Sequence, residues 1–155
     1  MKSSPYITVE GMVRLNEELE ERWQRRRVVL KALSAAAAEG DRSENAEYIY
    51  RKKELKGIDR RIRYLQKRMP DLRVVSDKPD VQEVIFFAAR VTLETEAGDE
   101  VEYRIVGPDE IDHEKGNISL DSPLAQALLK KQVDDEVTIH IQQGRKTYAI
   151  LAVHY

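Results

Sequence analysis

Residues 40–48 read Gly40-Asp41-Arg42-Ser43-Glu44-Asn45-Ala46-Glu47-Tyr48. On either side lie long segments whose apolar residues recur in steps of three and four, which is the period of an amphipathic helix. A short turn between two such segments predicts an antiparallel helical hairpin. The turn places the acids Asp41 and Glu44 at the tip, where a partner molecule can reach them.

The first helix is expected to begin after Thr8, whose hydroxyl is a good N-cap, although Gly11 weakens the first turn. Its apolar seam is predicted at Met12, Leu15, Leu19, Leu30, Leu33 and Ala37, with one break at Arg22 or Arg26. The second helix is expected over Ser43–Met69 and is ended by Pro70. Its seam is predicted at Leu55, Ile58, Ile62, Leu65 and Met69. Two such seams facing each other are typical of a coiled coil.

After Pro70 the pattern changes to short segments of alternating polar and apolar residues, which is typical of half-buried strands. The predicted strands are 72–76, 85–95, 100–106, 136–142 and 146–153. Ser122-Pro123 predicts the start of one short helix. The fold class is therefore α+β: an antiparallel coiled-coil hairpin over residues 1–71, followed over residues 72–155 by a small antiparallel-sheet domain with one short helix.

Charge differs between the two halves. Residues 1–70 hold 17 Lys and Arg against 11 Asp and Glu, and residues 71–155 hold 9 against 17. A basic module suits phosphates, whereas an acidic one suits a basic protein surface. The absence of cysteine excludes disulfides and thiol chemistry. With no signal-like N-terminus and no apolar run near 18 residues, we expect a soluble, cytoplasmic protein and no membrane partner.

Two interpretations of the tip acids stay open on spacing alone. Asp41 as an N-cap with Glu44 three residues later is a capping box, in which each side chain satisfies a free backbone N–H. Alternatively, two exposed carboxylates offer oxygen ligands to Mg²⁺, which needs six ligands and would require a partner to supply the others. The rest of the chain shows no self-sufficient catalytic grouping, so any chemistry here depends on a partner.

The helices near the tip are rich in groups that bind nucleic acid. Basic residues crowd the second helix, and tyrosines near its start could stack on unpaired bases. A solvated coiled-coil face is the alternative for such a charge run. The candidate RNA-binding residues are Arg42, Tyr48, Lys52, Lys53, Arg60 and Arg61.

These features resemble a known family. The stretch 40–48 is similar to the tip of the bacterial transcript cleavage factors GreA and GreB, and the similarity extends over nearly the whole chain. In the C-terminal half, Arg104-Ile105-Val106-Gly107, Asp109-Glu110 and the segment 118–129 also match the family pattern. Arg42, Tyr50, Lys52-Lys53 and the segment 59–65 resemble the GreB branch.

The resemblance implies a transcription elongation factor that stimulates RNA polymerase and is not itself an enzyme. The coil would enter the secondary channel of a backtracked polymerase, and the polymerase would cleave the extruded RNA 3′ end. Asp41 and Glu44 would help to hold Mg²⁺ jointly with the polymerase, with no metal held stably by the free protein.

The second domain, by the same resemblance, would have an FKBP-like fold and would dock on the rim of the channel. The residues expected to contact the polymerase are Ser119, Asp121, Ser122 and Pro123. The protein would act as a monomer. Two alternatives remain at this point: a non-cleaving regulator that occupies the same channel, and a prolyl isomerase suggested only by the FKBP-like fold.

Overall fold

A computed structural model describes residues 3–39 and 45–155. The chain divides into two compact units, one formed by Met12–Leu72 and the other by Met1–Gly11 together with Arg73–Tyr155. The first eleven residues were expected to belong to the hairpin domain, 1–71, but they group with the sheet. The reason is a short parallel pairing of β1 (Tyr6–Thr8) with β2 (Arg73–Val75).

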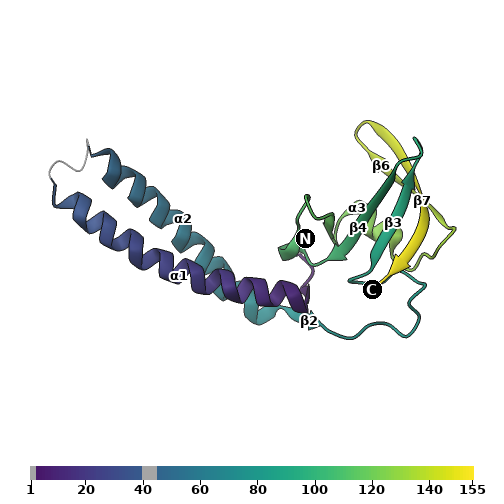
Figure 1. Ribbon diagram of the computed structural model, residues 1–155, viewed down its shortest axis with the longest axis horizontal. Coiled ribbons are helices and arrows are strands. Elements are labelled where there is room, and N and C mark those ends of the chain that lie inside the picture. The colour runs from purple at the N-terminus through teal and green to yellow at the C-terminus, as the bar shows by residue number, and fades with distance from the viewer. Residues whose placement is uncertain (1–2, 40–44) are drawn as a thin grey trace. The chain divides into compact units, whose positions relative to one another are not determined.

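The helical unit is a hairpin of two long antiparallel helices (Figure 1). Helix α1 runs over Val9–Ala37, and helix α2 runs over Ala46–Arg68. They have 29 and 23 residues, which at 1.5 Å per residue gives lengths of about 43 and 35 Å. The 3₁₀ turn η1 (Met69–Asp71) follows α2 directly and contains the proline that was expected to end the helix.

The hairpin buries a narrow apolar seam, and one stretch of the predicted seam was wrong. In α2 the buried residues Ile58, Ile62 and Leu65 agree with the prediction. In α1, Val29 is fully buried whereas Leu30 is 37% exposed. Arg26 occupies the seam position before Val29. The positions of the apolar residues alone therefore did not show where the seam continues.

Gly57 lies in the middle of α2 without an evident structural need for glycine. Its backbone is helical, and a Cβ added there would have no atom within 4 Å. Glycine costs about 1 kcal/mol relative to alanine in a helix interior. Gly57→Ala should therefore raise the thermal unfolding midpoint, followed by circular dichroism at 222 nm, while Gln66→Ala on the same helix should change it little. An unchanged or lower midpoint for Gly57→Ala would contradict the assignment.

The second unit is built on a five-stranded sheet with the strand order β5-β4-β3-β7-β6. All neighbours are antiparallel except β4 and β5, which pair in parallel. The fold is thus the predicted helical hairpin followed by a mostly antiparallel sheet. The strands are β3 (Arg90–Thr95), β4 (Glu100–Val106), β5 (Asn117–Ser119), β6 (Glu136–Ile141) and β7 (Gly144–His154).

The core of this unit lies on the sheet face that α3 (Pro123–Leu128) covers. Leu128 of α3 is fully buried together with Val91 and Leu93 of β3 and Ile150 of β7. Side chains alternate across each strand, so Glu94, next to Leu93, lies on the opposite face and is exposed. The short helix predicted from Ser122-Pro123 is therefore α3, which covers the core.

Two strands of this unit differ from the sequence prediction. The strand expected over 85–95 begins only at Arg90, because the preceding residues form a turn in which Ala88 has φ 74°. The three-residue strand β5 was missed, since so short a segment carries little alternation. Together with β1, it shows that the short strands of this chain are set by tertiary pairing.

The first turn of α1 is anchored to the sheet unit by a buried carboxylate. Glu110 ends the 3₁₀ turn η2 (Pro108–Glu110) and is only 6% exposed. It accepts hydrogen bonds from the backbone N–H groups of Thr8 (3.0 Å) and Gly107 (2.8 Å), and from the Thr8 hydroxyl. Thr8 Oγ1 in turn accepts from Gly11 N at 3.0 Å, which confirms Thr8 as the cap.

Candidate functional site

The tip acids Asp41 and Glu44, and Arg42 between them, lie outside the described residues. The start of α2 nevertheless corrects one prediction about them. The N-cap of α2 is Asn45, whose Oδ1 accepts from Tyr48 N at 3.1 Å. Neither acid therefore occupies the N-cap or N3 position of α2, and the capping box proposed for them is wrong for this helix.

Asn45 also joins the two helices at the tip end of the hairpin. Its Nδ2 donates a hydrogen bond of 2.8 Å to the carbonyl oxygen of Ala36, near the end of α1. The last carbonyls of a helix have no partner within the helix, so this bond satisfies one of them. One asparagine thus caps α2 and links it to α1, a role that the sequence analysis missed and that an Asn directly before a helix could have suggested.

Ion pairs connect α1 to α2 along the hairpin. Arg25 Nε lies 2.9 Å from Glu54 Oε2, and Arg26 Nε lies 2.7 Å from Asp59 Oδ1. Arg61 makes two hydrogen bonds to Glu18, of 2.7 and 2.9 Å. Arg61 was a candidate RNA-binding residue, but its guanidinium already holds the two helices together in this structure.

The Arg61 guanidinium is the main cause that lowers the pKa of Glu18 below its ordinary value. A carboxylate whose pKa is lower in the folded than in the unfolded protein stabilises the fold at pH values above its unfolded pKa. This stabilisation is lost as the pH falls through its folded pKa. Arg61→Ala removes this ion pair and should lower the free energy of unfolding at pH 7. The expected loss is limited to about 1 kcal/mol because the pair is partly exposed to solvent. The difference from wild type should shrink below about pH 4.

Urea unfolding of the two proteins at several pH values measures this difference. The exposed neighbour Arg60 serves as the control, because Arg60→Ala should leave the pH dependence unchanged. An Arg61→Ala deficit that is the same at pH 3 and pH 7 would count against the ion pair.

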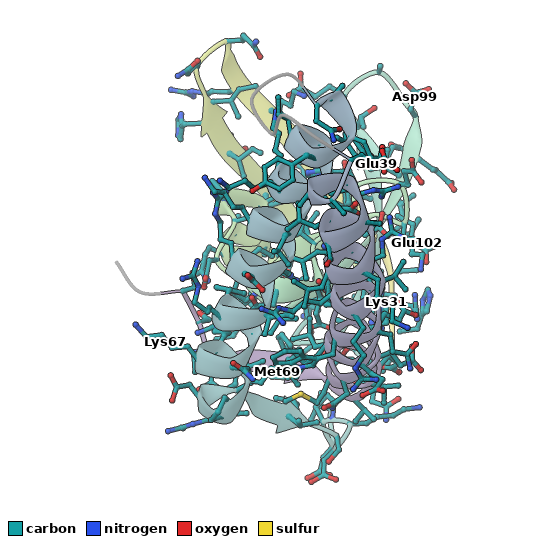
Figure 2. The ribbon with its side chains drawn as sticks, turned by 90° about the vertical axis from the view of Figure 1, so that its left-hand side faces the viewer. Lys31, Glu39, Lys67, Met69, Asp99 and Glu102 are labelled. Atoms are coloured by element: carbon teal, nitrogen blue, oxygen red, sulfur yellow. The ribbon has the colours of Figure 1, made fainter. Side chains whose placement is uncertain are left out.

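A row of cations lies on the face of α2 opposite the buried seam. Each member is exposed and makes no ion pair with another described residue. At steps of three and four these residues share one helix face, which extends for about 21 Å. Figure 2 shows one of them, Lys67, pointing away from α1. The basic row comprises Lys53, Lys56, Arg60, Arg63 and Lys67.

The candidate RNA-binding residues that the structure describes fall into two groups. Lys53 and Arg60 are exposed members of the basic row. Lys52 is exposed beside it, with its Nζ 5.8 Å from the centre of the half-buried Tyr48 ring. Arg61 belongs to the other group, since it is tied to α1.

The loop before α3 was expected to contact a protein partner, and only part of it is accessible. Asp121 and Pro123 are exposed, whereas Ser119 is 8% exposed and accepts from Asp121 N at 3.0 Å. Ser122 caps α3 by accepting from Ala125 N at 3.2 Å. The Asp121 carboxylate accepts from Ser4 N at 2.9 Å and from the Ser4 hydroxyl. The hydrogen bonds of Ser119 and Ser122 thus fix the conformation of the loop, and Asp121 and Pro123 are its exposed residues.

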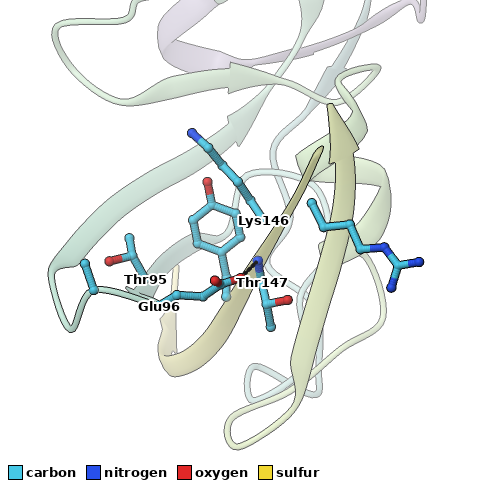
Figure 3. Close-up of a pocket in the computed structure, with 7 residues that line it drawn as sticks. Thr95, Glu96, Lys146 and Thr147 are labelled. Carbon is cyan, nitrogen blue, oxygen red and sulfur yellow. Dashed lines mark hydrogen bonds between the residues drawn. The ribbon is translucent and has the colours of Figure 1, made fainter. Parts of the chain in front are cut away.

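A pocket of about 200 Å³ opens between the turns of two hairpins (Figure 3). Glu96 from the β3–β4 turn accepts a hydrogen bond of 2.9 Å from Thr147 N on β7. Lys146 and the buried Tyr148 also line it. The groups form no nucleophile–base arrangement, and the Glu96 bond holds the two hairpins together.

Metal-binding and membrane-spanning features are lacking in the described part of the chain. Within residues 3–39 and 45–155, no three His, Asp or Glu side chains gather closely enough to hold a metal ion. No helix among these residues is both long and apolar enough to span a bilayer. The two carboxylates outside these residues, Asp41 and Glu44, are hard oxygen donors of the kind that Mg²⁺ prefers, but two ligands leave most of its coordination positions to a partner.

Comparisons with known proteins cover both units. The model of the GreA/GreB transcription elongation factor N-terminal domain matches residues 5–74, and that of the C-terminal domain matches residues 79–155. The chain belongs to the GreA/GreB family. A Xanthomonas axonopodis pv. citri protein named transcription elongation factor GreB is 56% identical, over 99% of this chain and 93% of its own length.

Other relatives support placement in the GreB branch. A Pseudomonas aeruginosa protein of the same name is 50% identical, over 98% of this chain and 91% of its own length. Among solved structures, GreA factor homolog 1 of Thermus thermophilus is 26% identical, over 97% of this chain and 98% of that one, with a TM-score of 0.43. The GreB resemblance expected from the sequence is confirmed by the two relatives named GreB, which are 56% and 50% identical.

Proposed function

We propose that this GreA/GreB family protein stimulates RNA polymerase to cleave the 3′ end of backtracked RNA, and so restarts arrested elongation complexes. The hairpin enters the secondary channel of the polymerase and the sheet unit binds at the rim. The protein is not an enzyme on its own, and it acts as a cytoplasmic monomer.

One observation carries the proposal: α2 is capped by Asn45, so the acids before it are not needed as its cap. We infer that Asp41 and Glu44 serve a partner's site instead. Helices of about 43 and 35 Å are long enough to carry them into a buried centre. The pair lies within residues 5–74, which the N-terminal domain model of the GreA/GreB transcription elongation factors matches, and this match supports the proposal.

The two carboxylates would supply part of the ligand set of a Mg²⁺ ion whose remaining ligands come from the polymerase and RNA. When bound, such an ion stabilises developing charge on a phosphodiester and lowers the pKa of a bound water. The role of this chain is to bring the two charges to the polymerase and to hold them on a rigid arm. The ion pairs between α1 and α2 supply the rigidity.

The exposed cations of α2 would hold the RNA segment that backtracking extrudes. We assign this role to Lys52, Lys53 and Arg60, which make no ion pair with another described residue, and to Arg42 and Tyr48 nearer the tip. At the rim of the channel, Asp121 and Pro123 would contact the polymerase, and Ser119 and Ser122 would hold their loop in shape through hydrogen bonds.

The test is addition of the protein to a purified, backtracked elongation complex in the presence of Mg²⁺. Release of short RNA 3′ fragments, followed by renewed elongation, is the expected result. A protein that binds the polymerase and inhibits it without releasing fragments would favour the alternative, a non-cleaving regulator of the same channel.

A further inference from the structure

The two edges of the five-stranded sheet differ in how they are protected. The edges are β5 and β6. β5 has only three residues, and a loop covers its outer side, because Asn117 exchanges backbone hydrogen bonds of 2.9 and 3.1 Å with Asp112. β6 has six residues and pairs with β7 on one side only. The outer side of β6 is therefore the open edge of this sheet.

Free backbone groups line this open edge. Ile150 N donates to the carbonyl oxygen of Asp135 at 2.9 Å, which fixes the residues of β6 that bond to β7. Bonding in an antiparallel pair alternates along the strand, so the N–H and C=O groups of Glu136, Thr138 and His140 point away from β7. Within residues 3–39 and 45–155, no other backbone group pairs with them.

The sequence of β6 lacks the devices that usually protect an edge strand. Such strands are blunted by lysine, by proline, by a bulge or by being very short. Residues 136–141 contain no lysine or proline, and their register with β7 is regular. An edge of this kind is a template for pairing with another strand.

A second copy of β6 fits this edge when it runs antiparallel and is centred on Ile139. Ile139 then lies opposite its own equivalent, Val137 lies opposite the second copy's Ile141, and Thr138 lies opposite His140. Val137 is buried and Ile139 packs against the core, so the apolar faces of the two copies coincide. The free backbone groups of Thr138 and His140 meet each other. A shift of one residue would oppose polar and apolar faces.

The charges at the two ends of β6 favour the antiparallel arrangement. Acids gather where the strand begins, and exposed cations follow the turn where it ends. Glu136 and Arg145 make no ion pair with another described residue, and both lie on the face opposite the core. Antiparallel pairing brings the acidic end of one copy to the basic end of the other, whereas parallel pairing brings like charges together. The acids are Asp134, Asp135 and Glu136, and the cations are Arg145 and Lys146.

We propose that two copies of this chain associate through their β6 strands, in antiparallel register about Ile139, so that their sheets become continuous. The twofold symmetry makes each contact occur twice. An interface built on one strand is small, which is typical of weak, transient association. The dimer is a form of the free protein at high concentration, and the monomer stays the form proposed to act on the polymerase.

The test is analytical ultracentrifugation of the full-length protein from about 1 to about 100 μM. The sedimentation coefficient of wild type should rise from that of a monomer toward that of a dimer. Thr138→Pro should raise the dissociation constant about tenfold or more, since it removes two hydrogen bonds between the copies. Proline is tolerated where an edge N–H faces solvent, so its thermal unfolding midpoint should stay close to wild type.

Charge reversal tests the register without proline. Glu136→Lys and Arg145→Glu should each weaken self-association about fivefold, because each sets like charges against one another twice. A mixture of the two variants should associate like wild type, since every contact in the mixed dimer joins opposite charges. Glu102→Lys, on the inner strand β4, is the matched control and should associate like wild type (Glu102 is labelled in Figure 2).

The proposal is overturned if wild type stays monomeric at about 100 μM. It is also overturned if the mixed variants associate no better than either one alone. A monomeric wild type whose affinity for the polymerase falls with Thr138→Pro would assign this edge to the polymerase. Failure of the proposed function is seen separately, as an absence of RNA fragments from the polymerase complex.

Discussion

Glu110→Ala is expected to destabilise the sheet unit by about 3 kcal/mol. The carboxylate is buried. It accepts hydrogen bonds from the backbone N–H groups of Thr8 and Gly107 and from the hydroxyl of Thr8. Alanine leaves these donors without a partner, and each buried unsatisfied group costs about 1–3 kcal/mol. It also removes the negative charge that lies at the positive N-terminus of α1.

Urea unfolding followed by tyrosine fluorescence measures the loss, and amide hydrogen exchange at Thr8 and Gly107 locates it. Glu114→Ala is the matched control, because it removes an exposed carboxylate four residues further along the same segment. Equal unfolding midpoints for the two variants would show that Glu110 does not anchor the first turn of α1.

This anchor also explains a residue that the sequence presented only as a weakness. Gly11 was expected to loosen the first turn of α1. In the structure, a Cβ at residue 11 would overlap the Glu110 carboxylate. The glycine therefore makes room for a group that lies about 100 residues away in the chain, and no local pattern reveals such a need.

The elements predicted well are those whose signal is local and long. The two helices, strand β4 and the Ser122 cap of α3 follow from periodicity and turn chemistry. The short strands β1 and β5 depend on pairing with distant strands. The seam of α1 was misplaced at Leu30, because Arg26, paired with Asp59, interrupts the apolar residues before the buried Val29.

The candidate site residues also divide into those that residue type could identify and those whose role depends on the fold. Lys53 and Arg60, which residue type singled out, are exposed in the structure. Arg61 has the same charge as they have, yet it is committed to Glu18, since charge pairing across two helices depends on their register. Asp41 was one candidate for the cap of α2, which Asn45 holds; both residue types are good caps, and only the helix start decides between them.

The central claim is that the tip acids complete a metal site inside RNA polymerase. The change Asp41→Asn with Glu44→Gln keeps the size of both side chains and removes their charges. Loss of charged ligands to a catalytic metal costs several kcal/mol of transition-state stabilisation, and each 1.36 kcal/mol is a tenfold change in rate. We therefore expect fragment release to fall by about 100-fold or more.

The sheet unit and the rest of the hairpin are unchanged in this variant, so its affinity for the polymerase should persist. Glu39→Gln is the matched control, since it removes an exposed acid just beyond the end of α1 (labelled in Figure 2). It should release fragments like wild type. Loss of polymerase binding by the double variant would assign the acids to docking.

The most direct measurement is the rate of RNA 3′-fragment release from a backtracked elongation complex saturated with wild-type or Asp41→Asn, Glu44→Gln protein at fixed Mg²⁺. The account predicts a double variant that occupies the polymerase yet releases fragments no faster than the polymerase alone. Release at the wild-type rate by that variant would contradict it.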